Sequence, residues 1–161
     1  MNESTISDKK NKRQKGIASL VARSKKVCNS FLKNEYTYSD AEAVRELGLD
    51  SELIARLIED YIQQIMRAIV SFEELLYELQ SAKDAKKELD YTEFRDLAHK
   101  NLGVARNLRI KDAEMLLEEL MKKDDLEYLF SCTEALYACT IVLNPECAYD
   151  ALALIEVKSS F

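Results

Sequence analysis

The stretch SELIARLIEDYIQQIMRAIVSFEELLYELQ, residues 51–80, decides the fold of this chain. Its apolar side chains recur every three or four positions over about eight helical turns, which is roughly 40 Å of helix. Asp50 precedes the stretch as an N-terminal cap. The apolar residues of the pattern are Ile54, Leu57, Ile58, Tyr61, Ile62, Ile65, Ile69, Phe72, Leu75, Leu76 and Leu79. A helix of this length with one apolar side is typical of a helical bundle, so we expect an all-α protein.

Composition supports one bundle domain with an extension. The chain has 161 residues, 47% of them hydrophobic, which is enough for one sizeable core. Only three Gly and one Pro are present, too few for the turns of a sheet protein. Ser39 and Glu42 have the spacing of a capping box and predict a short helix that ends near Gly48. We assign residues 35–161 to the bundle domain.

Further helices are expected after the long one. The polar residues 81–88 read as a connecting loop. Asp90 and Glu93 repeat the capping spacing at the start of a second amphipathic helix. Two more amphipathic segments follow, and Asn144 with Pro145 predicts the start of a terminal helix. Short connections between such helices give antiparallel neighbours, so we expect an up-down four-helix core with extra helices at both ends.

Charge is distributed unevenly along the chain. Residues 1–33 hold nine Lys or Arg against two acids, whereas the rest holds fourteen against twenty-seven. Residues 1–15 are polar and predict a disordered basic tail, and residues 16–34 predict an amphipathic basic helix. This helix is suited to contact a membrane surface or nucleic acid, or else to dock on the acidic bundle. We favour docking, because Phe31 and Leu32 lead directly into the folded region.

The cysteines argue against a metal site. Cys28, Cys132, Cys139 and Cys147 are widely spaced, form no CxxC pair and have a single histidine as a second ligand type. We therefore expect buried free thiols in a reducing compartment. The N-terminus is polar, without the apolar segment of a secretory signal, and we expect no apolar stretch that approaches the length of a membrane span. These features predict a cytoplasmic protein.

The histidine, His99, lies in the segment LAHKNLGVARNLRI, residues 97–110. On a helix, the predicted buried stripe consists of Phe94, Leu97, Ala98, Ala105 and Leu108. His99 falls at the flank of this stripe, so its imidazole is expected to face solvent. Gly103 lies one turn later, and glycine inside a helix costs about 1 kcal/mol relative to alanine. That cost is easier to explain at a docking surface, where a missing side chain lets a partner approach.

Residues 99–108 resemble the signature of the histidine-containing phosphotransfer (HPt) domain family. That signature has a histidine, two variable residues, a lysine, a glycine, a variable residue, a small residue, two variable residues and an apolar residue often followed by glycine. The chain matches it at His99, Gly103, Ala105 and Leu108. It departs at Leu102, which replaces the lysine, and at Arg109, where glycine often closes the helix. The predicted helices between residues 38 and 143 also follow the family's order.

The resemblance implies a phosphorelay intermediate. In this family a bundle histidine, here His99, exchanges a phosphoryl group with the aspartate of a response-regulator receiver domain. The resemblance also implies a protein without kinase or nucleotide-binding machinery, and the sequence has no Walker-type loop or kinase motif set. We therefore expect no cofactor, no metal and no small-molecule substrate, with any magnesium brought by the receiver. A receiver domain, and a hybrid histidine kinase, are the expected partners.

Three cations are candidates for the role of the missing lysine, which offsets phosphoryl charge in the family. They are Arg95, Lys100 and Arg106, although a solvated helix face without function is an equally good interpretation of each. Leu102 is predicted to form, together with Gly103, a docking patch beside the histidine. The loss of the lysine leaves a second hypothesis open, in which a degenerate bundle binds a receiver or kinase without carrying phosphate.

Overall fold

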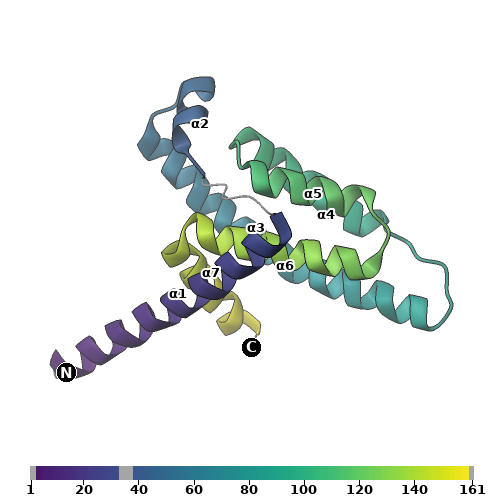
Figure 1. Cartoon of the computed structure of the whole chain (residues 1–161), viewed down its shortest axis with the longest axis horizontal. Coiled ribbons are helices and arrows are strands. Elements are labelled where there is room, and N and C mark those ends of the chain that lie inside the picture. Colours follow the sequence, from purple (N-terminus) through teal and green to yellow (C-terminus); the bar gives the residue numbers. More distant parts are fainter. Residues whose placement is uncertain (1–2, 33–37, 160–161) are drawn as a thin grey trace.

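A computed structural model describes residues 3–32 and 38–159 of the chain. These residues form seven helices and no strand, which confirms the predicted all-α class. The helices are α1 (Glu3–Leu32), α2 (Asp40–Leu47), α3 (Ser51–Asp84), α4 (Thr92–Asn107), α5 (Lys111–Lys122), α6 (Leu126–Leu143) and α7 (Pro145–Ser159). Figure 1 shows the long helix α3 running from α2, at the top of the view, to the loop before α4, at the right.

Four helices form a closed ring around the core. Helix α3 packs on α4, α4 on α5, α5 on α6, and α6 packs back on α3. The chain between α4 and α6 turns over short connections, which is compatible with the predicted up-down arrangement. The largest fully buried side chains of the ring include Phe72, Phe94, Leu116, Leu117, Leu120, Leu129 and Leu136. Their burial removes the apolar stripe of each helix from water and stabilises the ring.

Capping side chains set several helix boundaries where the sequence predicted them. The carboxylate of Asp50 accepts a hydrogen bond from the backbone N–H of Leu53 at 2.8 Å, at the start of α3. The hydroxyl of Ser39 caps α2, and Gly48 ends it in the left-handed region with φ 68°. Asn144 Oδ1 accepts from the backbone N–H three residues later at 3.2 Å. These bonds satisfy backbone groups that a helix end leaves unpaired.

The loop after α3 is shorter than predicted. Residues 81–88 were expected to be loop, but α3 continues to Asp84, whose carboxylate accepts a hydrogen bond from the side chain of Gln80 at 3.0 Å. The helix then closes through Lys86, which adopts φ 56°. The next helix begins at Thr92, whose backbone N–H donates to Asp90 Oδ1 at 3.0 Å. Helix α3 is therefore longer than its apolar pattern, because polar side chains one turn apart, such as Gln80 and Asp84, bond one another and stabilise the last turns.

The N-terminal prediction was wrong for most of residues 1–15. Helix α1 begins at Glu3 and continues without a break to Leu32, where a disordered tail had been expected before Gly16. Residues 6–15 contain no Gly or Pro and are rich in Lys, Arg and Gln, which form helices readily. Arg13 also pairs with Asp150 of α7, with Nη2 to Oδ1 at 2.9 Å. The first two residues, and residues 33 and 34, lie outside the described part of the chain.

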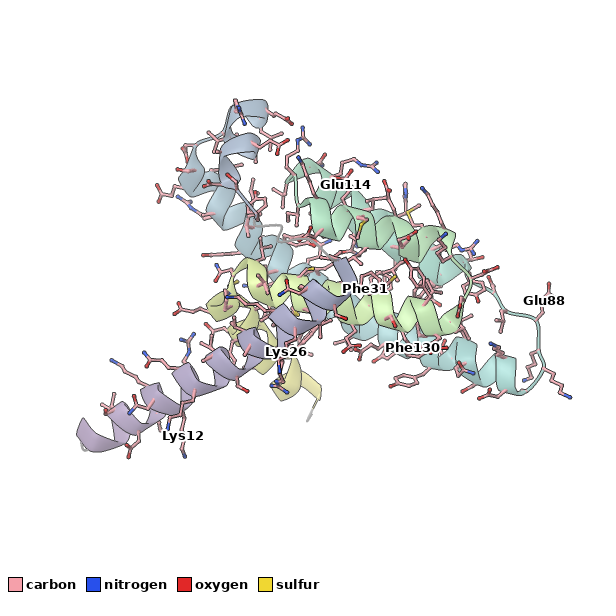
Figure 2. The ribbon with its side chains drawn as sticks, viewed as in Figure 1. Lys12, Lys26, Phe31, Glu88, Glu114 and Phe130 are labelled. Carbon is pink, nitrogen blue, oxygen red and sulfur yellow. The ribbon has the colours of Figure 1, made fainter. Side chains whose placement is uncertain are left out.

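Helix α1 docks on the bundle, as the favoured interpretation of its basic face predicted. It packs on α6 and on α7, and Gly16 permits the close approach, since a Cβ atom there would lie 3.2 Å from the hydroxyl of Tyr149. The side chains that pack against the core are Leu20, Val21, Phe31 and Leu32. The first turns extend past the bundle (Figure 1), and Figure 2 shows Lys12 on this extension and Lys26 closer to the bundle.

Helix α6 corrects the expectation about membrane spans. Among the described residues, Leu126–Leu143 is long and apolar enough to cross a membrane, judged by length and composition alone. Half of its residues are buried inside the protein, and it packs against α1, α3, α5 and α7. A helix covered on several sides needs apolar residues around most of its circumference. The burial of α6 therefore accounts for its composition.

Candidate functional site

His99 lies on the solvent-exposed side of α4, as predicted. The same side carries four other exposed residues within two helical turns in each direction, namely Thr92, Asp96, Gly103 and Arg106. The opposite side is buried and contains Phe94, Ala98, Asn101, Leu102 and Ala105. The imidazole is therefore accessible to another protein molecule.

Two contacts fix which side of α4 faces the core. The ring of Phe94 packs edge-on against Phe72 of α3, with ring centroids 5.2 Å apart. Asn101 is 2% exposed, and its Nδ2 donates to the backbone oxygen of Leu97 at 2.8 Å. Its Oδ1 accepts from Gln64 of α3 at 3.4 Å. A buried amide requires partners, so the bond between Gln64 and Asn101 resists rotation of α4 against α3. It thereby keeps His99 facing solvent.

The surface next to His99 is open at Gly103. This glycine is exposed, and a Cβ atom placed on it would meet no atom within 4 Å. Packing within the bundle therefore does not require glycine, and the helical backbone here has no positive φ. The open space favours a surface that another molecule covers, since nothing inside the protein explains the residue.

Leu102 does not form the predicted docking patch. It is 5% exposed and belongs to the hydrophobic core, whereas the predicted stripe had placed Leu97 there and left Leu102 at the surface. Leu97 is only partly buried. The cause is Asn101, a polar residue that is buried. A pattern of apolar residues leaves it out and therefore places the core side of α4 too far from Leu102. Of the two predicted docking residues, only Gly103 is available at the surface.

Two of the three candidate cations bind other side chains of the protein. Arg106 bonds two glutamates of α5, with Nε to Glu114 Oε1 at 3.1 Å and Nη2 to Glu118 Oε1 at 2.9 Å. The bond to Glu114 raises the pKa of Arg106 further above its usual range. The guanidinium of Arg95 lies over the ring of Tyr91, 4.9 Å from its centroid. Neither arginine is positioned as a free cation beside His99.

Lys100 is the candidate that keeps its charge available. It is exposed and forms no ion pair within the part of the chain that the structure describes. It directly follows His99, but successive helix positions point about 100° apart. Asp96, one turn before His99, is also exposed and places a negative charge near the imidazole. Sequence reasoning overlooked this carboxylate, although its spacing of three residues was visible.

The end of α4 keeps the backbone conformation that glycine favours at this place in the HPt signature. Arg109 adopts φ 61°, and the backbone N–H of Ile110 donates to the oxygen of Ala105 at 3.0 Å. These are the features of a helix terminus that usually contains glycine. The guanidinium of Arg109 pairs with Glu46 and donates to the oxygen of Arg106 at 2.7 Å, which helps to stabilise the strained residue.

The cysteines and carboxylates form no metal site in the described residues. No group of three His, Cys, Asp or Glu side chains is close enough to hold an ion there. The four cysteines are free thiols, but only Cys132 is fully buried, whereas burial had been expected for all of them. The other three lie on helices whose edges remain partly open to solvent.

Comparisons with known proteins give no match to a protein-family model, to a curated protein or to a solved structure. The resemblance of residues 99–108 to the HPt signature is therefore a proposal about function. What supports it is the geometry of α4: an exposed imidazole, an open glycine one turn later, and a glycine-type helix end at Arg109.

Proposed function

We propose that this protein is a phosphorelay intermediate of the HPt type, located in the cytoplasm, that carries a phosphoryl group on His99. The observation that carries the proposal is the pairing of an exposed imidazole with open space at Gly103 on the same side of α4. A receiver domain has to bring its aspartate within bonding distance of the imidazole, so the surface around His99 must admit close approach. A core histidine would not meet this requirement.

The transfer itself needs few other side chains. A neutral ring nitrogen of His99 attacks the phosphorus of the receiver's aspartyl phosphate, the new N–P bond forms, and the bond to the carboxylate oxygen breaks. The aspartate leaves as a carboxylate, and the second ring nitrogen keeps its proton. The same steps in reverse return the phosphoryl group to a receiver. The role of this protein is to position the imidazole, and any magnesium brought by the receiver would offset the phosphoryl charge.

The expected result for His99→Gln is complete loss of phosphoryl transfer with a normal fold. Glutamine keeps polarity but lacks the nucleophilic nitrogen, and the residue it replaces is exposed. A set of purified receiver domains, labelled on aspartate by a radioactive acyl phosphate in the presence of magnesium, is incubated with each variant. Lys100→Arg is the matched control, because it changes the neighbouring exposed residue, keeps its positive charge and leaves the imidazole in place. Label that persists on His99→Gln, or no label on the wild type from any receiver, contradicts the proposal.

Gly103→Glu is expected to weaken receiver binding at least tenfold and to leave the bundle at least as stable as the wild type. The new side chain fills open space, so it causes no clash inside the protein. Replacing a glycine inside a helix should even raise the free energy of unfolding by about 0.5–1 kcal/mol. Gly103→Ala is the control for side-chain size, with a similar gain in stability and a smaller loss of binding. Thermal melting and titration of a receiver domain measure the two effects, and normal binding by Gly103→Glu refutes a docking role.

A degenerate adaptor is the second candidate function. Two observations favour it: Leu102 is buried where the family has a lysine, and the guanidinium of Arg106 is bound by Glu114 and Glu118. Such a bundle would bind a receiver or a kinase through the same side of α4 without accepting phosphate. Saturable binding that Gly103→Glu weakens, combined with an unlabelled wild type, identifies the adaptor.

A further inference from the structure

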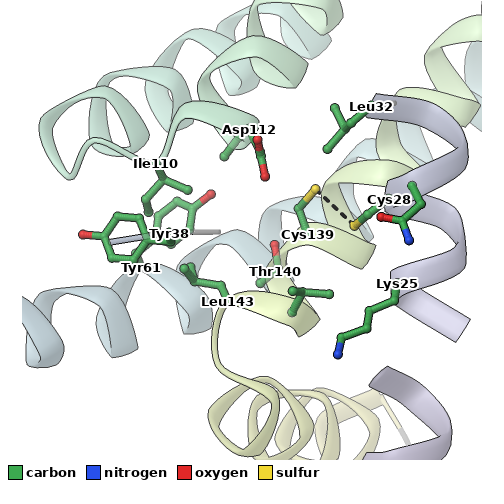
Figure 3. Close-up of a pocket in the computed structure, with 13 residues that line it drawn as sticks. Lys25, Cys28, Leu32, Tyr38, Tyr61, Ile110, Asp112, Cys139, Thr140 and Leu143 are labelled. Carbon is green, nitrogen blue, oxygen red and sulfur yellow. Dashed lines mark hydrogen bonds between the residues drawn. The ribbon is translucent and has the colours of Figure 1, made fainter. Parts of the chain in front are cut away.

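Two cysteines from distant parts of the sequence meet between α1 and α6. The sulfur atoms of Cys28 and Cys139 are 3.4 Å apart, and Figure 3 shows them pointing toward one another across the helix interface. We propose that Cys28 and Cys139 are a redox site, at which a reversible intramolecular disulfide ties α1 to the bundle. The proposal does not depend on phosphotransfer through His99.

Little movement is needed to form the bond. A disulfide has its sulfur atoms about 2.05 Å apart, so the pair must approach by about 1.4 Å. Helices α1 and α6 already pack against one another, and side chains at the end of α1, Phe31 and Leu32, contact the core close to the pair. Rotation of the two side chains is a smaller change than a shift of either helix, so the bundle can accept the bond without unfolding.

A cavity gives the pair access to small molecules. It has a volume of about 350 Å³ and lies where α1, α3, α5 and α6 meet. Both thiols line it, together with polar side chains that include Lys25, Asn29 and Asp112 (Figure 3). Cys132, by contrast, is 0% exposed. A peroxide or a small thiol can therefore reach Cys28 and Cys139, whereas the fully buried thiol is protected.

The pair divides into an attacking and a resolving thiol. The hydrogen bond between the two thiols lowers the pKa of Cys28, and the same bond, together with burial, raises the pKa of Cys139. The carboxylate of Asp112 opposes ionisation of both thiols, but desolvation raises its own pKa to about 6, which reduces its charge near that pH. Both thiols are partly exposed, and Cys28, whose pKa is lowered, is the one that reacts first with an oxidant as a thiolate.

Hydrogen peroxide serves as the oxidant in a balanced sequence. The thiolate of Cys28 attacks one oxygen of the peroxide, the O–O bond breaks, and a sulfenic acid and one water form. The thiol of Cys139 then attacks the sulfur of Cys28, the S–S bond forms, and the S–O bond breaks. The hydroxide leaves with the thiol proton as a second water. Two thiols and one peroxide give one disulfide and two waters. A dithiol reductant reverses the change by exchange.

The bond would act on a helix whose apolar contacts with the core are incomplete. The apolar residues by which α1 contacts the core are only partly buried, in contrast to the fully buried residues of the ring. Its basic N-terminal turns extend past the bundle (Figure 1). A disulfide near the other end of α1 would restrict opening of this helix and so change how readily its basic face is released.

The test treats the full-length protein with hydrogen peroxide and counts free thiols. We expect the count to fall from four to two, with a disulfide that joins the tryptic peptides 27–33 and 124–158 by mass spectrometry. The second peptide also contains Cys132 and Cys147, so substitutions are needed to assign the bond to Cys139. Cleavage by trypsin after Lys25 and Lys26 should slow at least tenfold in the oxidised protein, and dithiothreitol should restore the original rate. Four remaining thiols, disulfide-linked dimers, or sulfinic acid at Cys28 without a cross-link overturn the proposal.

Single substitutions locate the bond. Cys28→Ala and Cys139→Ser should both abolish the cross-linked peptide and the protection from trypsin. Cys28→Ala is the decisive variant, because Cys139 packs against the hydrophobic core, whereas Cys28 belongs to the docked helix α1. Cys147→Ser is the matched control, since Cys147 is also partly exposed but belongs to α7. A cross-link that persists in Cys28→Ala, or one that disappears in Cys147→Ser, contradicts the assignment.

Discussion

Leu102→Lys is expected to lower the free energy of unfolding by about 3 kcal/mol, because it removes a core side chain and introduces an ammonium group. Leu102 is 5% exposed and packs inside the ring of helices. A lysine there either buries its charge or bends its end toward solvent, and the second option limits the loss. Denaturation by urea measures the change, with an unchanged slope showing that the native state is still the bundle.

The same substitution restores the lysine of the HPt signature, so it also tests what that lysine can do in this protein. We expect no increase in the lifetime of a phosphohistidine at His99, because the new side chain starts from the buried side of α4 and not from the side of the imidazole. Each variant can be phosphorylated on His99 with phosphoramidate, a small phosphoryl donor. The decay of the phosphohistidine is then followed as loss of its N–P bond.

Gly103→Lys is the matched control for Leu102→Lys. The position is exposed and open, so the charge enters solvent one turn from His99 at no packing cost. Stability should rise by roughly 0.5–1 kcal/mol as glycine leaves the helix interior. The phosphohistidine should decay several-fold more slowly beside the added cation. If Leu102→Lys melts like the wild type, or if it prolongs the phosphohistidine more than Gly103→Lys does, the assigned orientation of α4 is wrong.

The features that sequence reasoning predicted correctly depend on neighbours along the chain. Asp50 caps α3 through an N–H three residues later, and Gly48 ends α2 by adopting a positive φ. The apolar repeat of α3 needs no knowledge of its partners, since a period of three to four residues is itself the property of an amphipathic helix. The exposed position of His99 on α4 was predicted for the same reason.

The errors arise where a residue's role depends on another helix. Asn101 is polar and therefore predicted to be exposed, yet Gln64 of α3 gives it a partner inside the protein. With Asn101 and Leu102 buried together, the core side of α4 lies closer to residue 102 than its apolar residues suggested. The sequence of α4 alone likewise predicts a free guanidinium at Arg106, because the glutamates that bind it belong to α5.

Long-range pairs lie beyond this kind of reasoning. Cys28 and Cys139 are 111 positions apart, and neither has a local pattern that marks it as reactive. The N-terminal turns of α1 show the same limit, because the contact of Arg13 with Asp150 of α7 is absent from any window of neighbouring residues. Composition alone favoured disorder for this segment, whereas its helix has a partner elsewhere in the fold.

Phe94→Ala is expected to lower the free energy of unfolding by about 4 kcal/mol, a typical cost of emptying a fully buried aromatic site. Phe94 is 1% exposed, and its ring packs edge-on against Phe72, which is 0% exposed. The substitution leaves a cavity between α3 and α4 that fully formed helices cannot collapse to fill. Urea denaturation followed by circular dichroism measures the loss.

Tyr77→Ala is the control, because it removes a ring from a similar aromatic pair at the surface. Tyr77 is 65% exposed, and its ring centroid lies 5.4 Å from that of Phe130. A surface pair of this kind contributes about 1 kcal/mol or less. Equal losses for the two variants would show that α4 does not pack through Phe94. The side of α4 assigned to His99 would then lose its main support, since the buried ring is what fixes the rotation of the helix that bears the imidazole.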